Sequence, residues 1–250
     1  MIRLQWSLKY LVFLETNILS SNYQVILGSL FLLIFKSMRK ISAILFDMDG
    51  VLVDATEWHY QALNRALYLF GFNISRYQHL STYNGLPTRK KLEVLTVEQG
   101  LSLGLHEIIC KLKQIYTNEE IYRECRPVFE KEYMIGRLRR EGYRLAVCSN
   151  SIRESVELMI RKSALYEHFD FLLSNEDISQ PKPSPEIYIQ AIQLMRCRPE
   201  EVVIVEDAPC GIEAAQRSGA HVCQVTGFED VNYFRIKKFI HQVENQGVIL

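Results

Sequence analysis

Short apolar segments alternate with amphipathic ones along the chain from residue 41 onward. Five of the apolar segments are nearly continuous runs of strand length, at residues 41–47, 143–149, 170–174, 201–206 and 221–226. Such runs are typical of strands buried on both faces of a parallel sheet. Helical periodicity follows most of these strands, at residues 153–162, 185–195 and 211–218. The alternation predicts an α/β fold in which helices cover a parallel sheet.

The alternation is interrupted between Asp54 and about Gly142, where helical periodicity occurs without a convincing buried strand. Apolar residues at helical spacing form a clear stripe from Trp58 to Phe70, which Gly71 ends. Further helices are expected at residues 89–97, 106–116 and 119–133. We therefore predict an inserted α-helical cap domain at residues 55–128, and a core domain made of residues 39–54 and 129–250.

Residues 1–38 form a hydrophobic extension that does not follow this pattern. The apolar run at residues 25–35 is short of the roughly 20 residues that a membrane-spanning helix needs. A basic segment follows it, instead of the small-residue cleavage site of a secretory signal. Natural translation could start at Met38, which would make the extension an artefact. A peripheral or membrane-anchored amphipathic extension is the alternative hypothesis.

The composition limits the classes of partner that are expected. The 250 residues are 48% hydrophobic and 23% charged, which suits a globular core domain with a smaller inserted one. Lys plus Arg equal Asp plus Glu at 29 each, so no general attraction to nucleic acid or an anionic membrane is expected. The six cysteines lack metal-binding spacing and indicate reduced thiols. We expect a cytoplasmic protein that is a monomer by default.

Polar side chains occur where the predicted strands end. The first strand leads into Asp47–Gly50, the second into Ser149–Asn150 and the fourth into Glu206–Asp207, while Lys182 lies in a proline-rich loop. Ligands bind beyond the carboxyl ends of the strands in an open parallel sheet, so these residues are expected to converge. Clustered carboxylates favour a hard divalent cation with oxygen ligands. We predict Mg²⁺, bound by Asp47 and Asp207 with help from Glu206.

Four segments of the chain resemble the ordered motifs of the haloacid dehalogenase superfamily. They are Asp47–Asp54, Ser149–Ser151, Lys182–Glu186 and Glu206–Asp207. Each motif is weak alone, but four in order at strand exits or loops make coincidence improbable. The resemblance covers residues 41 to 226 and implies a Rossmann-like core. The helical insertion resembles the cap of the β-phosphoglucomutase and phosphoglycolate phosphatase branch, and Gly85–Arg89 resembles the substrate-specificity loop of that branch.

The resemblance implies a role for each motif residue. Asp47 would attack phosphorus to form an aspartyl-phosphate, and Asp49 would protonate the leaving alcohol and later activate water. The main-chain carbonyl of Asp49 would also bind Mg²⁺. Ser149 and Asn150 are expected to bind phosphoryl oxygens, and Lys182 to offset their charge. Dehalogenases that attack carbon lack the second aspartate, so Asp49 argues against dehalogenation.

Other candidates have an ordinary structural interpretation beside the functional one. Arg89 could pair with a substrate phosphate or carboxylate, or it could be an exposed arginine at a helix start. Lys113 resembles a lysine that reaches the site in related caps. We interpret Asp54 as a helix cap. His59 could contact the substrate, or it could be a solvated or cap-facing residue, and we leave both Asp54 and His59 off the list of candidates. A calcium loop is excluded because residues 51–53 are apolar.

These observations predict an enzyme, namely a phosphoric monoester hydrolase of the haloacid dehalogenase type. Its substrate would be a small phosphorylated metabolite such as a sugar phosphate. A phosphomutase of the β-phosphoglucomutase type is an alternative, because residues 47–59 would support either reaction. A catalytically silent binding domain is a third hypothesis, against which the intact residues Asp47, Asp49, Lys182 and Asp207 argue. Phosphonoacetaldehyde hydrolysis would need a cap lysine that forms a Schiff base with the substrate, and the sequence does not identify such a lysine.

Overall fold

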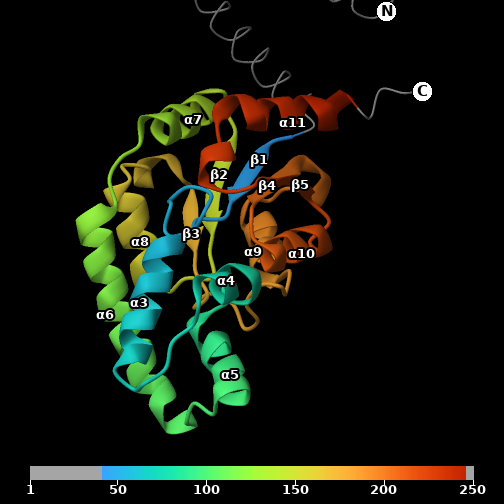
Figure 1. The fold of residues 1–250 in the computed structure, drawn as a ribbon. Helices are drawn as coiled ribbons and strands as arrows, with labels where there is room; N and C mark the ends of the chain where they lie inside the picture. Colours follow the sequence, from blue (N-terminus) through green and yellow to red (C-terminus); the bar gives the residue numbers. More distant parts are fainter. Residues whose placement is uncertain (1–40, 246–250) are drawn as a thin grey trace, which may run out of the picture. The chain divides into compact units, whose positions relative to one another are not determined.

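The computed structural model describes residues 41–245 (Figure 1). Its strands form one parallel sheet with the order β3-β2-β1-β4-β5. The strands are β1 (Ala43–Phe46), β2 (Arg144–Cys148), β3 (Phe171–Leu173), β4 (Val202–Glu206) and β5 (His221–Gln224). The predicted α/β fold is confirmed, and all five predicted strands are present within a few residues of their expected bounds. The first strand lies at the centre of the sheet, so its carboxyl end is flanked on both sides.

Helices of the core cover both faces of this sheet. They are α7 (Phe129–Arg140), α8 (Arg153–Lys162), α9 (Glu186–Leu194), α10 (Pro209–Arg217) and α11 (Tyr233–Asn245). Successive residues of a strand point to opposite faces. Ile44 and Phe46 therefore pack into a cluster with α7, α8 and α11, while Ala43 and Leu45 pack into another with α9 and α10. Burial on both faces explains why the strands are continuous apolar runs.

The segment between β1 and β2 contains helices and no strand of the sheet among the described residues. These helices are α3 (Thr56–Tyr68), α4 (Arg76–Gln78), α5 (Thr88–Gln99) and α6 (His106–Glu124), with short helical turns at His79–Tyr83 and Leu103–Leu105. In Figure 1, α5 lies away from α7 and α11, at the other end of the sheet.

This helical segment has a hydrophobic cluster of its own. The cluster consists of Leu63, Ala66, Leu67, Ile74, Tyr83, Leu92, Leu95, Leu101 and Ile109. By contrast, Ile121 near the end of α6 packs into the core cluster with α7. The separate cluster supports a cap at residues 55–128, although the division itself stays a prediction.

Two helix predictions were wrong. The helices expected at residues 106–116 and 119–133 are instead one continuous helix, α6, followed by α7. Thr117 and Asn118 do not interrupt the backbone pattern, and the break falls near Pro127, which lacks a backbone N–H. In addition, Asp54 is exposed and does not cap α3, whose N-cap residue is Ala55 without a side-chain hydrogen bond.

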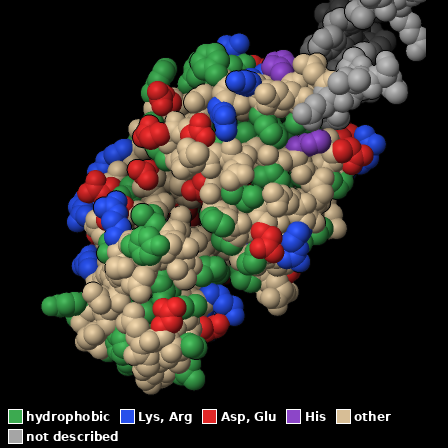
Figure 2. All heavy atoms as spheres, turned by 45° about the vertical axis from the view of Figure 1, so that its right-hand side comes forward, with side chains coloured by type: hydrophobic (Ala, Val, Ile, Leu, Met, Phe, Trp, Pro, Cys, Tyr) green, Lys and Arg blue, Asp and Glu red, His purple; other side chains and the backbone are tan. Residues whose placement is uncertain are grey.

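The predicted extension at residues 1–38 lies outside the described residues. Within residues 41–245, no helix is long and apolar enough to cross a membrane. The backbone N–H of Ile41 donates to Glu244 Oε1 of α11 at 3.4 Å, so the C-terminal helix holds the start of the described chain. On the face drawn in Figure 2, basic and acidic side chains are interspersed, in keeping with the zero formal charge.

Candidate active site

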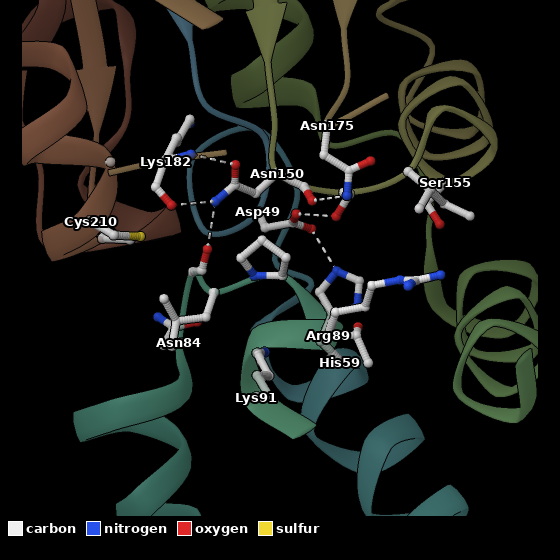
Figure 3. Close-up of a pocket in the computed structure, with 18 of the residues that line it drawn as sticks. Asp49, His59, Asn84, Arg89, Lys91, Asn150, Ser155, Asn175, Lys182 and Cys210 are labelled. Carbon is white, nitrogen blue, oxygen red and sulfur yellow. Dashed lines mark hydrogen bonds and ion pairs between the residues drawn. The ribbon is translucent and has the colours of Figure 1, made fainter. Parts of the chain in front are cut away.

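The candidate residues of the four motifs meet beyond the carboxyl ends of the strands (Figure 3). Asp47 follows β1, Ser149 follows β2, Glu206 ends β4, and Lys182 comes from the loop before α9. Asp47, Lys182 and Glu206 line a cavity of about 470 Å³ whose other wall is formed by α3, α5, α6 and the 84–88 loop. The convergence expected from the strand exits is thus present in the structure.

Lys182 joins two of the carboxylates. Its Nζ lies 2.6 Å from Asp47 Oδ1 and 2.6 Å from Glu206 Oε1, and it also donates to the carbonyl of Cys148 at 2.8 Å. Burial lowers the pKa of Lys182, but the two carboxylates raise it by more, so the ammonium keeps its proton. Lys182 therefore fixes the position of Asp47 relative to β4.

Asp47 is a buried carboxylate that the protein holds at one oxygen only. Burial raises its pKa well above the usual value, Glu206 adds to this, and Lys182 opposes it. While Lys182 binds Oδ1, Oδ2 makes no hydrogen bond to any residue within 41–245. One carboxylate oxygen is thus held by the protein, and the other is left for a ligand.

Asp207 adds a buried carboxylate oxygen without a partner. Its Oδ1 accepts no hydrogen bond in the described part of the chain. One oxygen each from Asp47, Glu206 and Asp207 lie within 4.8 Å of one another. Burial, with Glu206 adding to it, raises the pKa of Asp207 to about 7. Oxygen ligands with excess negative charge and an unsatisfied buried acceptor fit a hard divalent cation.

Glycine creates the space that these carboxylates occupy. Gly50 has φ +85°, and a Cβ there would lie 2.3 Å from Asp207 Oδ2. A Cβ at Gly211 would lie 1.9 Å from Glu206 Oε1. Any side chain at either position would push a carboxylate out of the cluster.

Glu206 is held from several directions. In addition to Lys182, the hydroxyl of Tyr188 donates to Oε1 at 2.6 Å, and the backbone N–H groups of Asp207 and Ala208 donate to Oε2 at 3.1 and 3.3 Å. Tyr188 lies in the segment 185–195, for which the sequence pattern predicted a helix but no contact with the site. Glu206 therefore positions Lys182 as well as contributing to the acidic cluster.

Asp49 is the end of a chain of polar contacts that reaches into α6. His59 Nε2 lies 2.9 Å from Asp49 Oδ1, and Lys113 Nζ lies 3.0 Å from His59 Nδ1. An ammonium only donates, so Nδ1 accepts and Nε2 carries the proton that is donated to Asp49. Burial raises the pKa of Asp49, but His59 and Ser151 lower it to about 2, so this carboxylate is ionised.

The structure brings His59 to Asp49, so the interpretation as a solvated histidine was wrong, although its other ring nitrogen does face Lys113 of the cap. Ser151 Oγ also donates to Asp49 Oδ2, at 2.9 Å, and Ser149 Oγ does so at 3.4 Å. A sequence signal for His59 existed, since it lies on the first helix after the Asp47 motif and one helical turn after Thr56. Its partner in the cavity could not be derived from that position alone.

The remaining candidate residues, Lys113, Arg89 and Asn150, differ in their contacts and exposure. Lys113 and Arg89 both line the cavity, and Arg89 is exposed. The amide of Asn150 donates to the carbonyl of Gly85 at 3.0 Å and accepts from the backbone N–H of Lys182 at 3.0 Å. It thereby connects the loop before α5 to the lysine loop. The sequence analysis missed Lys91, a buried lysine of α5 that also lines the cavity.

Comparisons with known proteins agree with this architecture. The family model described as haloacid dehalogenase-like hydrolase matches residues 44–225. The pyrophosphatase PpaX of Bacillus thuringiensis is 27% identical over 192 residues, which cover 75% of this chain and 84% of that protein. CbbY of Rhodobacter sphaeroides in complex with phosphate superposes with a TM-score of 0.68 at 26% identity, covering 75% of this chain and 87% of CbbY.

A third protein, the β-phosphoglucomutase of Clostridium difficile, superposes with a TM-score of 0.71 over 84% of this chain and all of that one. The sequence identity is 19%, so this likeness concerns the fold. The likeness extends over the helical segment as well as the sheet, because so much of both chains is covered.

Proposed function

This chain belongs to the haloacid dehalogenase-like hydrolase family, and from that premise we propose that it is a Mg²⁺-dependent phosphatase of a small phosphorylated metabolite. One observation carries the proposal. Asp47 has one oxygen fixed by Lys182, while its second oxygen has no partner within the described residues. A carboxylate held in this way is suited to attack phosphorus and form an aspartyl-phosphate.

In the first step, Asp47 Oδ2 forms a bond to phosphorus and the bond to the leaving oxygen breaks. The leaving oxygen takes a proton from Asp49. Because Asp49 is ionised in the free protein, it must first receive this proton, and His59 Nε2–H is its hydrogen-bonded donor at 2.9 Å. Lys113, 3.0 Å from His59 Nδ1, can replace the proton on the imidazole. In the second step, Asp49 deprotonates the water that releases phosphate from Asp47.

Asp47 and Asp207 would hold Mg²⁺, with Glu206 and the main-chain carbonyl of Asp49 as further ligands. The unpartnered buried oxygen of Asp207 supports this assignment. When bound, the ion neutralises charge on the transferring phosphoryl group. The ammonium of Lys182 likewise offsets negative charge, at the carboxylate of Asp47.

The phosphoryl oxygens are proposed to receive hydrogen bonds from Ser149 and from backbone N–H groups beside Asn150. Lys113 and Arg89 are proposed to contact the substrate from the cap. A cytoplasmic location and a monomeric state stay predictions.

The test is the variant Asp47→Asn, with the exposed neighbour Asp54→Asn as the matched control. Each protein is assayed with Mg²⁺ for release of phosphate from p-nitrophenyl phosphate and from a panel of phosphorylated metabolites. Loss of the nucleophile should lower kcat by about 10³-fold or more, because a covalent step cannot be replaced by binding alone. Asp54→Asn should match the wild type.

Three other results would contradict the proposal. Turnover in Asp47→Asn close to that of the wild type would exclude the aspartyl-phosphate mechanism. Formation of an isomeric sugar phosphate without net phosphate release would identify a phosphomutase. Absence of turnover by the wild type across the panel would favour a binding domain.

A further inference from the structure

The cavity has opposite charges at its two ends. Carboxylates from the strand ends lie at one end, while α5 and α6 contribute cations at the other. The cations are Arg89, Lys91, Lys111 and Lys113. None of the cavity-lining residues from these two helices is acidic. A substrate whose phosphoryl group lies at Asp47 would therefore extend its leaving group toward positive charge.

Lys91 differs from the other lysines at this end of the cavity. Lys111 is exposed and pairs with Glu107 at 2.7 Å, and Lys113 contacts His59. Lys91 is only 6% exposed and lines the cavity, and its side-chain amine makes no hydrogen bond or ion pair with any residue in the range 41–245. Figure 3 shows its side chain extending from α5 toward the group that contains Asp49 and His59.

A buried amine without a partner is costly for a protein. Desolvation of an unpaired polar group costs about 1–3 kcal/mol in proteins, and more when the group is charged. Burial and the neighbouring Lys113 lower the pKa of Lys91 to about 7, so even near neutral pH a large fraction carries a charge. An anionic ligand group beside Lys91 would supply the missing counter-charge and hydrogen-bond acceptor.

We propose that Lys91 binds a second anionic group of the substrate, located on the portion that leaves when Asp47 takes the phosphoryl group. The inference rests on the proposed function, which fixes the orientation of the substrate in the cavity. The substrate class is then a phosphate ester whose leaving group carries a carboxylate or another phosphoryl group. Esters of uncharged alcohols, including simple sugar monophosphates, would leave Lys91 without a partner and bind less well.

The test is binding of non-hydrolysable matched pairs in the presence of Mg²⁺, measured by isothermal titration calorimetry. One pair is phosphonoacetate and its uncharged amide, phosphonoacetamide. The other is propane-1,3-bisphosphonate and propylphosphonate. The proteins are wild type, Lys91→Met and Lys90→Met. Lys90 is the exposed neighbour on α5, where it pairs with Glu93 at 2.8 Å.

In at least one pair, the wild type should bind the compound with two anionic groups about tenfold or more tightly than the compound with one. This is the effect of one hydrogen bond to a charged group. Which pair shows the preference distinguishes a carboxylate from a second phosphoryl group. Lys91→Met should reduce that preference about tenfold, while Lys90→Met should preserve it. Lys91→Arg should keep most of the preference because it keeps the charge.

Equal affinity of the wild type for both members of each pair would overturn the inference, as would an unchanged preference in Lys91→Met. These binding results do not depend on turnover. A failure of the proposed function would appear separately, as normal turnover in Asp47→Asn or as no turnover in the wild type. Unfolding of Lys91→Met is not expected, since methionine replaces a buried amine by an apolar group of similar length.

Discussion

Lys182 is the residue on which the geometry of the catalytic carboxylates most depends. It is buried, and its ammonium lies 2.6 Å from both Asp47 and Glu206. Without it, two carboxylates would remain in a buried site with no protein cation between them. Removing one partner of a buried ion pair is far more damaging than removing an exposed one.

We expect Lys182→Met to lower the free energy of unfolding by about 3–5 kcal/mol in a metal-free buffer, the usual cost of leaving a buried charge unpaired. Added Mg²⁺ should recover part of this loss, since a cation bound at Asp47 and Asp207 restores positive charge. Urea unfolding with and without Mg²⁺ measures both effects. The exposed Lys238→Met is the control and should change stability little. A loss of less than about 1 kcal/mol would mean that the carboxylates already share a proton.

At the residue scale, motif spacing predicted which residues meet at the strand ends much better than which residues of the cap line the cavity. Asp47, Ser149, Lys182 and Asp207 follow strands whose mutual order is restricted by the parallel sheet. Lys91 is different, because its burial depends on how α5 packs against α6. In the sequence it is one of two adjacent lysines, and nothing local distinguishes it from the exposed Lys90.

At the scale of elements, α5 contains a group that should make stability depend on pH. The pKa of Lys91 in the folded protein is about 7, below its usual value of 10.5. Between these two values the unfolded chain binds more protons at this site than the folded one does. Its contribution to the free energy of unfolding therefore increases as pH rises from about 7 to about 10.

We expect Lys91→Met to be more stable than the wild type by about 1–3 kcal/mol near neutral pH, the cost of burying an unpartnered polar group. This gain should shrink as the pH is raised toward 10.5, the usual pKa of lysine, well above which the wild-type amine is neutral in both states. Chemical denaturation across this pH range, without ligand, gives the difference. Lys90→Met should show no such trend. A gain that does not vary with pH would contradict the assigned burial of the amine.

Asn150 connects two loops, and we expect its removal to affect turnover more than stability. Asn150→Ala would release both the carbonyl of Gly85 and the backbone N–H of Lys182. Misplacement of the lysine loop by a fraction of an ångström should lower kcat/KM about 10- to 100-fold. Asn118→Ala is the matched control. The side-chain amide of Asn118 on α6 donates to Glu154 Oε1 at 2.9 Å, and Asn118 does not line the cavity around Asp47. Similar losses in both variants would show that Asn150 acts only through general cap contacts.

Within the cap, helix ends could be predicted where the chain contains a residue that breaks helices. Gly71 and Gly100 follow helices, have positive φ, and are recognisable in the sequence. Between Tyr116 and Glu119 there is no such residue, and α6 continues through the point where one helix was expected to end and the next to begin. No helix was predicted after the last strand, although Ile236, Ile240 and Val243 of α11 have clear helical spacing and are buried.

At the scale of the whole molecule, the described residues contain a five-stranded sheet with hydrophobic clusters on both of its faces. Residues 40–250 cluster as one unit. The hydrophobic cluster beside α11 begins with Ile41, which is completely buried, and ends with Val243. Every strand of the sheet lies after residue 42. The alternation of strands and helices that the sequence predicts also starts at residue 41.

We therefore expect a chain that begins at Met38 to match the full chain in Tm and in kcat/KM for any phosphate ester that the enzyme hydrolyses. Ile41→Ala in the trimmed chain is the destabilised reference. It removes a fully buried side chain and should lower the free energy of unfolding by about 2–5 kcal/mol. Thermal unfolding and steady-state kinetics on the three proteins provide the comparison. If trimming alone lowered stability as much as Ile41→Ala does, residues 1–37 would have to contribute contacts of their own. Equal Tm values for the full and trimmed chains would restrict any role of the extension to the location of the enzyme, because neither the sheet nor the carboxylates around Asp47 would depend on it.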